Sequence, residues 1–295
     1  MADAALTASP GAGVGGRARF AARAVGTVWP VLMVVGVIVA IWYAACLPMN
    51  VKEQLTQAER AGAVIVPEGG QARRDASPWA LMVRNPAHLG GVWSQDRPRL
   101  PAPHQVAVEL WDTTVGMAVQ GRAFSNRSLF THAWVTLSAT LLGFAIGTGL
   151  GVLLAVGIVH NRAMDMSVMP WAIASQTIPI LALAPMIIVV LNSVGVSGLL
   201  PKALISAYLS FFPVVVGMVK GLRSPDAMQL DLLRTYNASR AQTFRKLRLP
   251  ASMPFLFASL KVGVAASLVG AIVGELPTGA VAGLGARLLA GSYYG

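Results

Sequence analysis

The sequence SPDAMQLDLLRTYNASRAQTFRKLRLP, residues 224–250, is the one long polar stretch in the second half of an otherwise apolar chain. It begins with Ser224, Pro225 and Asp226, which are a helix N-cap residue, a proline suited to the first helical position and an acid suited to the first turn. A short helix is therefore expected to begin at Ser224.

A sharp turn and a second helix are expected to follow. Asn237 tolerates the left-handed backbone conformation found at helix ends, and Ser239 with Gln242 forms a capping box for a helix that we expect to end at Pro250. This second helix interleaves basic and apolar residues: Arg240, Phe244, Arg245, Lys246, Leu247 and Arg248. Such a pair of short charged helices is typical of a docking element, not of a membrane span.

The composition indicates a membrane protein. Of 295 residues, 55% are hydrophobic and 12% charged, and the mean hydropathy is +0.62, which is too apolar for an ordinary soluble domain. The net charge of +11 fits basic loops beside membrane spans, whereas no basic run interleaved with aromatic residues predicts a nucleic-acid groove. Cys46 is the single cysteine, so the chain cannot form an internal disulfide.

Residues 1–27 are predicted to be a disordered cytoplasmic tail, and residues 28–47 the first transmembrane helix. A cleaved signal peptide is the alternative, but the apolar run is longer than a usual signal core, so we expect an uncleaved anchor. Arg17, Arg19 and Arg23 precede it and place the N-terminus in the cytoplasm by the positive-inside tendency.

Residues 48–131 are charged and interrupted by glycine and proline, which predicts an external insertion. In its last part, Val106, Leu110 and Met117 recur at helical spacing. We therefore expect residues 104–119 to form an amphipathic helix on the membrane surface.

The remaining residues, 132–295, are predicted to form a membrane core with the loop at 224–250 on its cytoplasmic side. Apolar runs predict four further spans, at residues 134–159, 168–191, 199–219 and 253–273. Gly143, Gly147 and Gly151 lie four residues apart in the first of these. Because no strand precedes them, they indicate close helix packing and not a nucleotide-binding loop.

Two features of the core are candidate pathway elements. Pro179 bends the span at 168–191, and Gln176 and Thr177 just before it can satisfy the freed backbone groups; this is either a gate or a kink needed for packing. Glu275 ends the last span, where an acid is either a gate or solute contact or an interfacial carboxylate in water.

Catalytic motifs are absent from the sequence. No lysine follows a glycine, so there is no Gly-Lys-Ser/Thr phosphate loop, and no Gly-x-Ser-x-Gly turn occurs. The four histidines share no metal-ligand spacing, so we expect neither a metal nor a cofactor. A polytopic protein without such motifs is expected to move a solute, as part of a transporter or as a solitary secondary transporter or channel, or to be a membrane scaffold.

The loop resembles the cytoplasmic signature of bacterial ABC-importer permeases, on the residues Asp231, Asn237, Leu247, Leu249 and Pro250. The segments Leu100-Pro101, Gln176-x-x-Pro179, Gly274-Glu275 and Gly283-Leu284-Gly285 look like the nitrate/sulfonate/bicarbonate branch. The chain departs from the pattern at Leu232 and Leu233, where the family has small residues, and at Asn237, where it has glycine.

The resemblance implies an all-α polytopic subunit of the bacterial inner membrane, without an ATPase site of its own. Its implied partners are a cytoplasmic ABC ATPase dimer that binds ATP, a second permease copy, a periplasmic substrate-binding protein and membrane lipid. It assigns ATPase coupling to Asp231, Asn237, Ala238, Ser239, Arg240, Leu247 and Pro250. It assigns the translocation path to Gln176, Thr177, Pro179 and Glu275.

Two further expectations follow from the resemblance. The family has six spans, whereas five are visible here, so we expect a truncated or atypical C-terminal end or a span count that is wrong by one. The outer run from Gly274 to Gly279 looks like that of permeases for small nitrogen-containing heterocycles such as pyrimidine precursors, while nitrate and sulfonate stay open as substrates.

Overall fold

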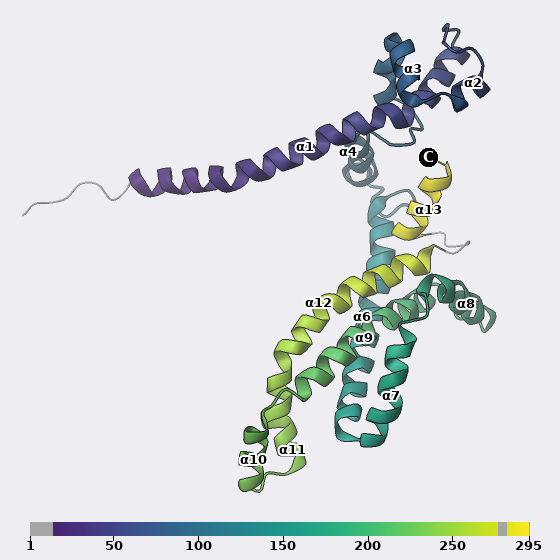
Figure 1. The fold of residues 1–295 in the computed structure, drawn as a ribbon. Coiled ribbons are helices and arrows are strands. Elements are labelled where there is room, and N and C mark those ends of the chain that lie inside the picture. Colours follow the sequence, from purple (N-terminus) through teal and green to yellow (C-terminus); the bar gives the residue numbers. More distant parts are fainter. Residues whose placement is uncertain (1–13, 277–281, 295) are drawn as a thin grey trace, which may run out of the picture. The chain divides into compact units, whose positions relative to one another are not determined.

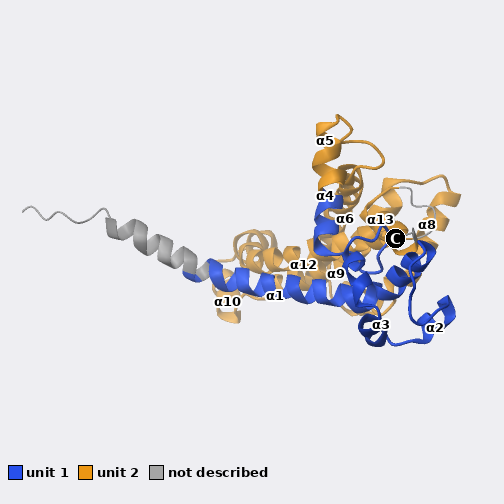
Figure 2. Cartoon of the chain, turned by 90° about the horizontal axis from the view of Figure 1, so that it is seen from above, with its two compact units in different colours: residues 1–110, 295 blue, residues 111–294 orange. Residues whose placement is uncertain are grey.

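The computed structural model describes residues 14–276 and 282–294, and these form helices joined by short loops, with no strand among them (Figure 1). Two compact units divide the chain, residues 1–110 and residues 111–294 (Figure 2). Four of the described helices are long and apolar enough to cross a membrane, and a bent helix pair makes a fifth candidate. The prediction of an all-α polytopic protein with about five spans is therefore confirmed.

The first unit is built on α1, Val14–Arg60, a single helix of 47 residues. Residues 1–13 of the expected disordered tail lie outside the described residues, but from Val14 onward that expectation was wrong, because the chain is already helical. The helix also continues past the expected end of the span at Leu47. Pro48 removes only one hydrogen bond of the helix, and the segment that follows, VKEQLTQAE, is rich in helix-forming residues.

The insertion is itself helical and has a small core. It contains α2 (Gly70–Asp75), α3 (Pro78–Arg84), the 3₁₀ helix η1 (Pro86–Trp93) and α4 (Pro103–Trp111). The buried residues of its core are Val51, Leu55, Ile65 and Leu81. The turns η2 (Asp112–Gly116) and α5 (Met117–Val119) follow α4, so helix at 104–119 is confirmed.

Several polar contacts hold the insertion to α1, those of Asn50 and Arg73 among them. The Asn50 side chain accepts from the backbone N–H of Leu100 at 3.0 Å and donates to its carbonyl at 2.7 Å. Arg73 is almost completely buried and donates to the Glu59 carboxylate. That hydrogen bond raises the pKa of the Arg73 guanidinium. The insertion is thus a folded structure anchored on α1 and not an unstructured loop.

The second unit contains three long helices that pack side by side: α6 (Leu129–His160), α9 (Leu199–Leu222) and α12 (Leu249–Glu275) (Figure 1). They match the spans expected at 134–159, 199–219 and 253–273. The glycines of α6 face α9 at very short range, since a Cβ at Gly143 would overlap Ser206 and one at Gly151 would lie 3.0 Å from Val214. The packing interpretation of these glycines is confirmed.

The span expected at 168–191 is not a single kinked helix, and this prediction was wrong. Two helices, α7 (Arg162–Ser175) and α8 (Ile180–Ser193), meet at an angle of 100°. Pro179 has no N–H to donate and disfavours helical backbone at Ile178, so the helix is weakest at this point, and here it stops. Beyond residues 277–281, which lie outside the described part of the chain, α13 spans Leu284–Tyr294.

Candidate functional site

The loop between α9 and α12 contains the two expected helices, but the first begins two residues later than predicted. Helix α10 is Ala227–Thr235, and Asp226 is its N-cap, in a capping box with Gln229. Ser224 cannot serve as N-cap, because its hydroxyl donates to the Gly221 carbonyl at 2.8 Å and so belongs to the end of α9.

The turn between the two loop helices follows the prediction closely. Asn237 has φ of +50°, and the N–H of the next residue, Ala238, donates back to the Leu233 carbonyl at 2.9 Å, as in a Schellman-type helix end. Ser239 and Gln242 then form the expected capping box, with the Ser239 N–H donating to the Gln242 side chain at 2.8 Å. The left-handed residue and the second cap are confirmed.

The second loop helix does not end at Pro250, so that prediction was wrong. The short helix α11, Arg240–Thr243, passes through a π-helical turn, η3 (Phe244–Arg248), directly into α12. Pro250 lies in the first turn of α12. The wider π turn accommodates the proline, which therefore continues the helix. The loop is consequently joined to a membrane-spanning helix without a break.

The surface of the loop is exposed, while its base is anchored. No residue of α10, α11 or η3 is buried. Met228, Leu232 and Tyr236 follow one another at four-residue spacing and are 78, 56 and 76% exposed, which makes an apolar ridge along one face. At the base, Phe244 packs on the core between α6 and α9 and meets the His160 ring edge-on at 5.3 Å.

The residues assigned to coupling surround this ridge and the turn. Asp231 pairs with Arg234 within α10 at 2.9 Å, and Asn237, Ala238, Ser239 and Arg240 form the tip between the two helices. Leu247 is half-buried in the π turn and Pro250 is exposed. The structure therefore brings the assigned residues onto one continuous segment, at one end of the α9–α12 pair (Figure 1).

Three of the path candidates lie in the break between α7 and α8. Thr177 donates its hydroxyl to the Ala174 carbonyl at 2.8 Å, a group that also accepts the Thr177 N–H. The carbonyl that Pro179 leaves without a helical donor is that of Ser175, and it accepts the Tyr208 hydroxyl. Thr177 therefore does not have the expected role of satisfying the freed carbonyl, and neither does Gln176, whose side-chain amide donates to the Ser175 hydroxyl at 3.4 Å. Pro179 is exposed and is the N-cap of α8.

Glu275, the fourth path candidate, is fully buried at the end of α12 away from the loop. The alternative of a carboxylate in water is therefore wrong. Its carboxylate accepts from the Thr136 hydroxyl at 2.9 Å and from the Gly285 N–H at 2.9 Å, and Lys202 lies 3.8 Å away. The group ties α6, α9, α12 and the start of α13 together.

A histidine extends this group. Gly283 donates its N–H to His132 Nδ1 at 3.0 Å, and His132 Nε2 lies 3.0 Å from the Asn126 carbonyl, so the ring is held as the tautomer protonated on Nε2. Lys202 also donates to the Ala282 carbonyl at 2.9 Å. We call His132, Thr136, Lys202, Glu275 and residues 282–285 the Glu275 cluster. From the sequence, only Glu275 was assigned a role, and Gly283-Leu284-Gly285 was noted as a family-like segment. For His132 and Thr136, their four-residue spacing was the available signal.

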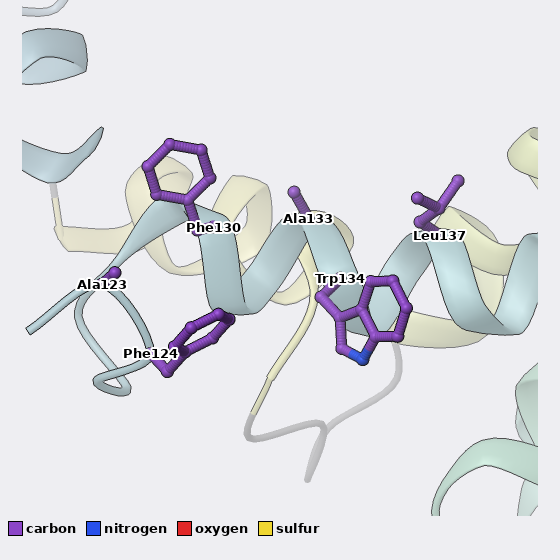
Figure 3. Close-up of a pocket in the computed structure, with 6 residues that line it drawn as sticks. All are labelled: Ala123, Phe124, Phe130, Ala133, Trp134 and Leu137. Atoms are coloured by element: carbon purple, nitrogen blue, oxygen red, sulfur yellow. The ribbon is translucent and has the colours of Figure 1, made fainter. Parts of the chain in front are cut away.

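A shallow depression of about 440 Å³ lies at the start of α6 and is lined only by apolar side chains: Ala123, Phe124, Phe130, Ala133, Trp134 and Leu137 (Figure 3). The indole N–H of Trp134 is the one polar side-chain group among these residues. Within residues 14–276 and 282–294, no three His, Cys, Asp or Glu side chains gather as a metal site.

Comparison with known proteins gives the family. Proteins described as the binding-protein-dependent transport system inner membrane component match residues 147–295, just over half of the chain. The chain belongs to this family. The resemblance inferred from the loop is thereby confirmed, and with it a multi-pass membrane protein that serves as a transport subunit. The family membership disfavours a solitary transporter or a scaffold.

Individual relatives are similar to the permease over about two-thirds of their own lengths. The formylaminopyrimidine transport permease protein ThiX of Halalkalibacterium halodurans is 33% identical over 63% of this chain and 68% of its own. The riboflavin transport system permease protein RibX of Chloroflexus aurantiacus is 33% identical over 64% and 65%, respectively. A probable ABC transporter permease protein of Haemophilus influenzae is 32% identical over 57% and 67%.

Proposed function

We propose that this permease carries a small nitrogen-containing heterocyclic solute across a bacterial inner membrane, driven by a separate cytoplasmic ABC ATPase dimer. A periplasmic binding protein delivers the solute, and a second copy of the permease completes the pathway. The observation that carries the proposal is the exposed loop at 224–250, whose two helices are capped and whose second helix continues into α12.

The loop has the properties of a docking element for another protein. The apolar ridge of Met228, Leu232 and Tyr236 is exposed on a loop whose other side chains are largely charged or polar, and such a ridge on a non-membrane segment marks an interaction site. Leu232 is one of the positions where the family has a small residue. We therefore propose that the cleft of the partner ATPase that receives the loop is wider opposite Leu232 than in relatives with a small residue there.

The loop can pass movement to the membrane helices because it is not flexibly attached. Capping boxes at Asp226 and Ser239 and the left-handed turn at Asn237 satisfy its helix ends, which makes the backbone a defined structure. Through η3 it is continuous with α12. When the ATPase dimer closes on ATP, it would move the loop. Because the loop would contact the open and the closed dimer differently, closure would shift the attached membrane helices.

We propose that the break containing Gln176, Thr177 and Pro179 borders the pathway, because Thr177 and Pro179 are exposed there and a polar side chain in a span needs water or solute around it. Glu275 lies at the end of α12 that is remote from the loop. Its carboxylate already accepts from Thr136 and Gly285, so we propose that it holds together the helices around the pathway and does not bind the solute. This chain needs neither a metal nor a bound cofactor for that task.

The heterocyclic solute is proposed from the relatives. ThiX is named for formylaminopyrimidine and RibX for riboflavin, and both solutes are nitrogen-containing heteroaromatic compounds. Their common chemistry favours a heterocycle over nitrate or a sulfonate for this permease.

Uptake into proteoliposomes that hold the permease, its ATPase and the binding protein tests the proposal. A panel of radiolabelled pyrimidines, flavins, nitrate and a sulfonate is offered with ATP inside the vesicles. We expect ATP-dependent uptake of a heterocycle, lost with Leu232→Ser and retained with Ala227→Ser, a change at an exposed position of α10 away from the ridge. Uptake of nitrate or sulfonate alone would overturn the solute class, and uptake without the ATPase would overturn the mechanism.

A further inference from the structure

An ion pair joins the root of the loop to the first half of the broken span. Arg223, the C-cap residue of α9 that directly precedes the loop, places its guanidinium 2.8 Å from the carboxylate of Asp165 in the first turn of α7. The two side chains are 47 and 37% exposed. Helix α7 is thus tied at its first turn to the point where the loop leaves the membrane core.

The other end of α7 is also bonded to α9. Tyr208, inside α9, donates its hydroxyl to the carbonyl of Ser175, the last residue of α7. The break begins at the next residue, Gln176. If α7 moved along its axis, it would therefore displace the residues of the break directly.

Polar contacts matter more for α7 than for its neighbours, because little of it is packed within this chain. Ala172 is its one buried residue, whereas α9 buries twelve. Met166 and Trp171 are 68 and 78% exposed. The start of the helix is defined by Asn161, whose side chain caps the Ala163 N–H at 2.9 Å, so Asp165 has a defined position opposite Arg223.

We propose that Asp165 and Arg223 form a clasp that passes movement of the loop to α7 and so to the break at residues 176–179. This inference rests on the proposed function, since it assigns a route within the same ATP-driven cycle. Both are positioning residues that touch neither solute nor ATP. Because the pair is exposed, it contributes little to folding, and its loss should change coupling while the protein stays folded.

The test measures solute imported per ATP hydrolysed, in proteoliposomes of the complete transporter. The variants are Asp165→Asn, Arg223→Gln, the reversals Asp165→Arg and Arg223→Asp, and the swap that combines both reversals. Arg162→Gln is the matched control, since Arg162 is exposed in the same turn of α7.

We expect each single change to lower the ratio about fivefold or more, with thermal unfolding in detergent unchanged. The swap should restore the ratio to near that of the unaltered protein, and the control should keep it. An unchanged ratio in the single variants, or a swap no better than the single reversals, would overturn the clasp. Failure of the proposed function would look different, because the unaltered permease would then import without the ATPase or not at all.

Discussion

The hydroxyl of Thr136 on α6 connects two distant parts of the chain: it donates to the Glu275 carboxylate at 2.9 Å and accepts the Leu284 N–H at 2.8 Å. One side chain thus holds the end of α12 and the first turn of α13. The Thr136 hydroxyl can make both contacts because a hydroxyl is a donor and an acceptor at once.

Replacing Thr136 should show how much this connection contributes. Thr136→Val keeps the shape and removes both bonds, so the free energy of unfolding should fall by about 1–3 kcal/mol, because the buried Glu275 carboxylate loses a donor and the half-buried Leu284 N–H loses its acceptor. Thr136→Ser should keep most of that stability. Thermal unfolding in detergent measures both; a valine variant as stable as the serine variant would contradict the role of the hydroxyl.

Gly283 should not tolerate replacement by a residue with a side chain. Its φ is +129°, and a Cβ there would overlap the Glu275 carboxyl group. Gly283→Ala is therefore expected to destabilise by about 1–3 kcal/mol. Gly291→Ala, inside α13 where nothing lies within 4 Å, should instead stabilise by about 0.5–1 kcal/mol. Equal melting temperatures for the two variants would count against the close approach of Gly283 to Glu275.

The packing of α6 on α9 can be tested with two glycines of the same helix. A Cβ at Gly147 would lie 2.9 Å from the Ala207 carbonyl oxygen, whereas Gly149 has open space. Gly147→Ala should cost about 1–3 kcal/mol by pushing the helices apart, and Gly149→Ala should cost nothing. Unfolding in mixed micelles separates the two, and a harmless Gly147→Ala would show that the helices are not so close.

The turn at Asn237 should matter for coupling. Its φ of +50° suits glycine and asparagine, while a β-branched residue there is strained by about 1–2 kcal/mol. We expect Asn237→Gly to preserve ATP-driven uptake and Asn237→Val to lower both ATPase binding and uptake. Pull-down of the ATPase with each variant measures this, and full binding by the valine variant would argue against a geometric role for the turn.

Local patterns were predictable and long-range contacts were not. The Ser239–Gln242 box and the left-handed Asn237 depend on residues within a few positions of each other, and hydropathy located the spans. The first cap was displaced because the Ser224 hydroxyl bonds to Gly221 across the helix end. That competition depends on where α9 ends, which the sequence does not mark.

The break at Pro179 and the Glu275 cluster show the same limit. A proline predicts a disturbance in a span, but whether the helix bends or stops with a 100° turn depends on what packs around it. Glu275 and Thr136 are 139 positions apart. Only the packing of α6, α9 and α12 brings them together, so no spacing in the sequence could assign the contact.

The loop at 224–250 is proposed to couple solute import to a separate ATPase. ATP-dependent uptake in proteoliposomes, compared between the unaltered permease and Leu232→Ser with Ala227→Ser as control, tests it most directly. We predict uptake that requires the ATPase and is lost only in the Leu232 variant. Uptake in vesicles that contain no ATPase, or full ATP-driven uptake by Leu232→Ser, would contradict it.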